Sequence, residues 1–150
     1  MGSLINKRSA QGRTDGVAVP AGYVGEVRTT GAQNITMSTT ASVVTNITNA
    51  VLASVPAGSW LFILQANIGG SVLNPGNLYI SQFSGTTNTD VVEGDNLISF
   101  SAPTAASSAG TTLVYPLVLG TPTTMYGKFL CSVTQATAVI RYTFRAVRIA

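Results

Sequence analysis

The segment that decides the fold lies at the end of the chain, where residues 138–149 read AVIRYTFRAVRI. Apolar and aromatic side chains occupy alternate positions, namely Ile140, Tyr142, Phe144 and Ala146. The positions between them carry Arg141, Thr143 and Arg145. A period of two sends successive side chains to opposite sides of an extended backbone. The segment is therefore predicted to be a β-strand with one face in a core and the other in solvent.

Upstream of this segment, runs rich in β-branched residues alternate with clusters of Gly, Pro, Asn and Ser, which is the pattern of strands and turns. Strands are predicted over residues 23–28, 42–47, 51–55, 60–67, 78–83, 97–101, 112–119 and 125–133. Residues 134–137 are predicted to join the last two strands as a hairpin, and residues 105–110 to form a loop. Short strands at roughly ten-residue spacing predict an all-β fold, an antiparallel β-sandwich of the jelly-roll kind.

The run WLFIL at residues 60–64 differs from the other predicted strands. It is apolar at both odd and even positions, whereas a half-exposed strand alternates. Such a run is typical of a strand that is buried on both faces.

The tetrapeptide VPAG occurs twice, at residues 19–22 and 55–58, each time shortly before an aromatic residue, Tyr23 or Trp60. Proline fixes φ at a turn corner and glycine relaxes the exit from it. Both copies are predicted to be turns that lead into strands.

The length of 150 residues fits one domain. Residues 1–18 contain Gly2, Gly12 and Gly16 and no sustained apolar period, so we expect an extended N-terminal arm followed by a β-sandwich domain over residues 19–150. We expect the arm to lie along a neighbouring subunit, with Lys7, Arg8 and Arg13 as its docking residues. No apolar run suits a signal peptide or a membrane span, so no membrane partner is expected.

Charge is scarce, at 9% of residues against about 25% in a typical soluble domain. Residues 29–89 contain none. A small soluble domain can tolerate such a surface, but few charges leave it poorly protected against association. We favour the second interpretation, in which an oligomer covers much of the surface.

Several function classes are disfavoured by the residues that the chain lacks. There is no histidine, so the commonest general base and metal ligand are missing, and Cys131 is the only cysteine. No Ser or Thr stands beside a recognisable activating base. The net charge of +3 comes without a dense basic run or an aromatic–basic motif. We therefore expect no enzyme activity, cofactor, metal site or nucleic-acid partner.

Three carboxylates cluster at Asp90, Glu93 and Asp95. A solvated acidic loop is the simplest interpretation. Calcium binding through oxygen ligands and a glycosidase pair are alternatives. A further alternative is that these carboxylates form ion pairs with Arg141 or Arg145 of a neighbouring subunit.

Four segments together resemble a family of small structural proteins of tailed bacteriophages. They are VPAGYVGE at residues 19–26, SVPAGSW at 54–60, TMY at 124–126 and RAVR at 145–148. The resemblance implies a component of the virion surface, in capsid decoration or in head or tail fibres, and β-sandwich modules that are often trimeric.

The leading hypothesis is therefore a virion structural protein that is assembled in the host cytoplasm. It self-associates, with a trimer favoured, and docks through its arm onto a major capsid protein or a tail- or portal-associated protein. The main alternative is a receptor-binding module at a fibre tip, in which loops over residues 69–77 or 84–95 contact a host glycan. A glycosidase using Asp90 with Glu93 or Asp95 is the third hypothesis.

Overall fold

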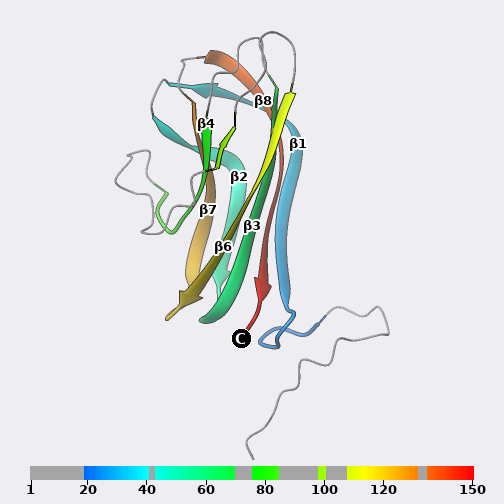
Figure 1. The fold of residues 1–150 in the computed structure, drawn as a ribbon. Helices are drawn as coiled ribbons and strands as arrows, with labels where there is room; N and C mark the ends of the chain where they lie inside the picture. The colour runs from blue at the N-terminus through cyan, green and yellow to red at the C-terminus, as the bar shows by residue number, and fades with distance from the viewer. Residues whose placement is uncertain (1–18, 41–42, 70–75, 85–97, 101–107, 132–134) are drawn as a thin grey trace, which may run out of the picture.

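Antiparallel strands make up the chain in this structure, a computed structural model that describes residues 19–40, 43–69, 76–84, 98–100, 108–131 and 135–150. The described residues form eight strands and no helix (Figure 1). The strands are β1 (Val27–Thr39), β2 (Val44–Val55), β3 (Gly58–Gly69), β4 (Gly76–Ser81), β5 (Ile98–Phe100), β6 (Ser108–Leu119), β7 (Thr123–Cys131) and β8 (Gln135–Arg148).

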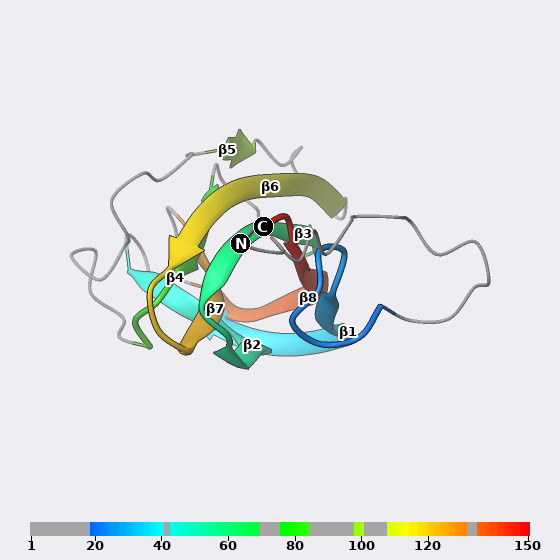
Figure 2. The same cartoon turned by 90° about the horizontal axis from the view of Figure 1, so that it is seen from below.

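The strands pair from the outside of the sequence inward. The first pairs with the last, β2 with β7, β3 with β6, and β4 with β5, all antiparallel. Two four-stranded sheets result, in the orders β1-β8-β3-β6 and β2-β7-β4-β5. Figure 2 shows them on opposite sides of a common core. This is the strand order of a jelly roll, so the predicted β-sandwich is confirmed.

The core lies between the sheets and is dominated by aromatic and aliphatic side chains. The alternation predicted for β8 is confirmed, because residues 140, 142, 144 and 146 are buried while Arg141 and Arg145 are exposed. The rings of Phe62 and Phe144, on adjacent strands, lie 6.3 Å apart at 39°. Such tilted ring pairs add to the stabilisation that burial gives.

The predicted hairpin between the last two strands is wrong. The strand β7 lies in one sheet and β8 in the other, so the two strands do not pair with each other. The apolar side chains of β8 point inward whether its partner is β7 or β1 and β3. The period-two pattern fixes which face is buried, but it does not select the neighbouring strand.

Other boundaries also differ from the prediction. The two strands expected over residues 42–47 and 51–55 form one strand, β2, whose register shifts between Asn46 and Val51. Asn49 has φ of 63°, a left-handed conformation that Asn adopts more readily than most residues. The sequence suggested a turn here because this irregularity interrupts the apolar pattern.

At the start of the domain, residues 23–26 form a turn, and β1 then extends to Thr39, well beyond the predicted end at residue 28. Among its described side chains, Ala32 and Ile35 pack against the core, and no apolar run marked the strand. The strand β6 begins at Ser108, inside the segment that was predicted to be a loop. The proposed arm, residues 1–18, lies outside the described residues.

Candidate assembly surface

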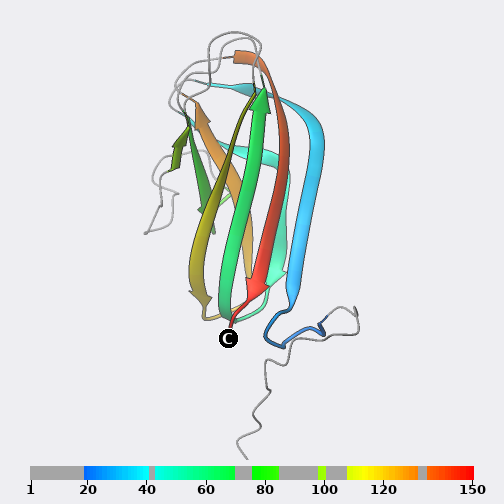
Figure 3. The same cartoon turned by 45° about the vertical axis from the view of Figure 1, so that its right-hand side comes forward.

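The sheet β1-β8-β3-β6 has an outer face, turned away from the core, that the described residues leave open (Figure 3). Register places its side chains in rows across the four strands. One row contains Val27, Val147, Leu61 and Pro116. The next contains Thr29, Arg145, Ile63 and Val114. Each row is built by neighbouring strands and not by one loop, so the face is rigid.

One half of this face is apolar. The residues of this apolar half are Val27, Leu61, Ile63, Val114, Pro116, Val118 and Val147. Three of the valines are well exposed, with 55% for Val27, 43% for Val114 and 72% for Val118. Strand and row spacings give the rows that hold these residues a flat area of about 400 Å², which also includes Thr29 and Arg145. Contiguous apolar surface of this size commonly marks an interaction site.

The burial of side chains along β3 indicates most clearly that another molecule covers this face. Trp60, Phe62 and Leu64 are fully buried, as predicted. Leu61 and Ile63, on the outer side, are only half-buried. The strand β3 was predicted to be buried on both faces. Within the described chain, its inner face is fully buried and its outer face is not.

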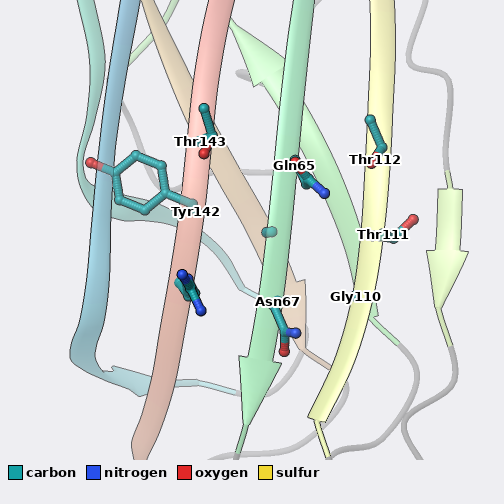
Figure 4. A pocket seen from close by; sticks show the side chains of 9 residues that line it. Gln65, Asn67, Gly110, Thr111, Thr112, Tyr142 and Thr143 are labelled. Carbon is teal, nitrogen blue, oxygen red and sulfur yellow. The ribbon is translucent and has the colours of Figure 1, made fainter.

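The other half of the face is polar and contains a hollow of about 560 Å³ (Figure 4). Gln65, Asn67, Thr112, Arg141 and Thr143 line it. Within the described part of the chain, none of these side chains is engaged in a hydrogen bond or ion pair. The hollow thus offers amides, hydroxyls and one guanidinium to an external partner.

The charges on the face have one sign in the described residues. Arg141 and Arg145 are exposed on it, at positions that the alternation of β8 predicted. Their proposed partners, Asp90, Glu93 and Asp95, lie outside the described residues. Glu26 is the one acidic residue in the described ranges, and it is engaged elsewhere.

Glu26 lies at the end of the sandwich where β1 begins and β8 finishes. Its carboxylate accepts hydrogen bonds from Arg148 Nε at 3.2 Å, Arg28 Nε at 3.1 Å and the Gly22 N–H at 2.7 Å. Burial by itself raises the pKa of Glu26, but these bonds outweigh burial and hold the pKa below its ordinary value.

Both VPAG turns converge on Arg148 as well. Its guanidinium donates to the Ala57 carbonyl at 3.0 Å and lies 4.5 Å from the centre of the Trp60 ring. The first turn reaches it through Glu26, which the Gly22 N–H holds. Sequence reasoning missed this cluster, although the repeated turn and the conspicuous final arginine were its signal.

The remaining predicted site residues are not placed. Lys7, Arg8 and Arg13 lie outside the described residues, as do most of the two loops proposed to bind glycan. No group of three or more potential metal-ligating side chains occurs within the described ranges. None of the described residues belongs to a helix that could span a membrane.

Comparison with known proteins finds matches among solved structures. No family model and no curated protein matches the chain. Among solved structures, a chain from the structure of the infectious bursal disease virus Gx strain is similar, with a TM-score of 0.44 and 12% identity. The match covers 95% of this chain and 38% of that one. The chain therefore spans well under half the length of this structural neighbour.

Proposed function

We propose that the chain is a structural protein of a tailed-bacteriophage virion. Its β-domain self-associates, with a trimer as the expected state, through the apolar half of the outer face. The proposal rests on the strand β3, which is apolar on both of its faces. Within the described chain, only its inner face is fully buried. A second copy of the chain would cover the exposed side.

The energetics favour such a contact. Removing apolar surface from water stabilises an interface by about 2.5 kcal/mol for every 100 Å² buried, before the cost of association. The chain has few charged residues. This is consistent with a protein whose surface contacts other subunits in an assembly instead of water. The resemblance of four segments to phage structural proteins is the reason for placing this assembly in a virion. Such a role requires neither a catalytic residue nor a cofactor.

In this proposal the N-terminal arm docks the oligomer onto a larger virion protein, either the major capsid protein or one associated with the tail or portal. Lys7, Arg8 and Arg13 would supply cationic contacts. An extended arm can form backbone hydrogen bonds with the edge of a partner's sheet, and a short segment is enough to do so.

The test of this role is made on virions. Antibodies against the β-domain should label purified phage particles in the electron microscope. Deleting residues 1–18 should abolish incorporation while leaving the oligomeric mass of the purified protein unchanged. Unlabelled particles, or normal incorporation of the truncated chain, would refute the virion role and the docking role respectively.

A receptor-binding module is the second candidate, and the polar hollow favours it. Two amides, two hydroxyls and the Arg141 guanidinium suit a sugar that carries a carboxylate, because arginine pairs with carboxylates in a bidentate fashion. This role requires an open hollow. It competes with an assembly that covers the whole face.

The second candidate is tested by screening the purified protein on immobilised glycans. Binding restricted to acidic glycans and lost in Arg141→Ala, but kept in Arg28→Ala at the far end of the sandwich, would support it. Absence of acidic-glycan binding by the wild-type protein would dismiss it.

A further inference from the structure

The strand β6 is the most regular sheet edge in the described residues, although β5 lies near it. The ladders of edge strands β1 and β2 contain register shifts, and β5 is only 3 residues long. By contrast, β6 pairs with β3 over 12 consecutive residues without a shift, and it contains no charged residue. Proteins normally interrupt or charge such edges, because their free backbone groups invite pairing.

Pro116 shows how this edge is oriented. Proline has no N–H, so in an unbroken ladder its nitrogen faces away from β3. Backbone groups alternate in direction along a strand, so the carbonyls of Gly110, Thr112 and Val114 face the free edge as well. The side chains of Thr112 and Val114 are turned to the outer face. The edge thus combines free carbonyl acceptors with the exposed Val114 and Val118.

Area argues against a symmetric contact of two apolar halves. A stable interface buries about 800 Å² per partner, roughly twice the area of the apolar half. A copy that uses two different surfaces, the apolar half toward one neighbour and the β6 edge toward the other, forms two contacts instead of one. Contacts between unlike surfaces close into rings when the rotation allows.

Charge argues the same way. Stacking two outer faces over their full extent would bring Arg141 and Arg145 of both copies together. The β6 edge presents no charge, and its carbonyls accept hydrogen bonds from a guanidinium. Register puts Arg145 in the row of Val114, and Arg141 in the row of Gly110.

From these observations we infer that the β6 edge of one copy packs on the apolar half of the next, over β1 and β8. The contact repeats around an axis parallel to the strands. Such an axis keeps every row at its own level. Pro116 of one copy then lies level with Val27 and Val147 of the next, with Val114 and Val118 one row to either side, and the arginines meet the carbonyls of the β6 edge. The inference rests on the proposed self-association and specifies its geometry.

The test uses two single-cysteine additions, Val118→Cys on β6 and Val27→Cys on β1. The two variants are co-expressed with different affinity tags, and mixed oligomers are treated with a short bifunctional thiol reagent. The inference expects a covalent dimer between unlike chains in the mixture and at most a trace in either variant alone. The wild-type protein, with Cys131 only, is the control for background linkage.

The outcomes separate this geometry from the proposed function. Strong linkage within either variant alone would show a symmetric contact and overturn the inference while self-association stands. Oligomers of native mass without linkage in the mixture would do the same. A protein that is monomeric by light scattering would overturn both.

Discussion

At the residue scale, the Glu26–Arg148 ion pair links the start of the first strand to the end of the last strand. Glu26 precedes β1 and Arg148 ends β8, and both side chains are more than nine-tenths buried. A buried pair adds little over a well-packed apolar pair, but removing one partner leaves an uncompensated charge. The pair therefore affects stability mainly because loss of one partner would leave the other charge buried and unpaired.

Glu26→Gln is expected to lower the free energy of unfolding by about 3 kcal/mol, because the buried Arg148 loses its counter-ion. Urea denaturation followed by tryptophan fluorescence measures the change, since Trp60 lies against Arg148. Arg28→Gln is the matched control. Its side chain is 34% exposed, so a loss below about 1 kcal/mol is expected. Equal losses in both variants would contradict this account.

Stability should also depend on pH through Glu26. The pKa of its carboxyl is lowered in the folded state, so the unfolded chain binds a proton more readily. The stabilisation is complete above the ordinary value of 4.5 and is lost as the pH falls through the folded pKa. Urea midpoints measured across the acid range should fall less steeply in Glu26→Gln. Identical pH profiles would exclude this carboxylate as the source.

At the scale of elements, the sequence predicted the strands that alternate or that are wholly apolar. The strand β8 and the centre of β3 were identified because burial dictates their side chains. The strand β1 was mostly missed, because its sequence contains no sustained apolar alternation; of its described side chains, Ala32 and Ile35 pack against the core. Strand pairing was missed between β7 and β8, because it depends on contacts distant in sequence.

Close packing between the sheets makes a second prediction at this scale. A Cβ added at Gly127 in β7 would lie 3.1 Å from both Ala50 Cβ and Leu64 Cδ1. Gly127→Ala should therefore cost about 1–3 kcal/mol of stability through overpacking. Gly120→Ala is the control, since no atom lies within 4 Å of its added Cβ. Thermal unfolding of the two variants checks this, and a stable Gly127→Ala protein would contradict the packing.

At the scale of the whole molecule, the outer face joins the sequence pattern to the proposed function. The sequence located Arg141 and Arg145 on an exposed face and showed that β3 is apolar on both sides. It did not show that these features belong to one surface, because Val27, Val114 and Val118 join them only through strand register. Their proposed acidic partners remain a prediction.

The most direct test of the central claim is the oligomeric mass of Val118→Asp, measured by light scattering. The account predicts an oligomer, with a trimer expected, for the wild-type chain of 15.5 kDa, and a folded monomer for the variant. A carboxylate placed in an apolar contact should weaken association at least 100-fold, equivalent to about 3 kcal/mol. The control Phe83→Asp replaces another exposed apolar residue, 56% exposed and off this face, and should keep the native mass. A monomeric wild-type protein, or an oligomeric Val118→Asp protein, would contradict the claim that this face is buried between copies.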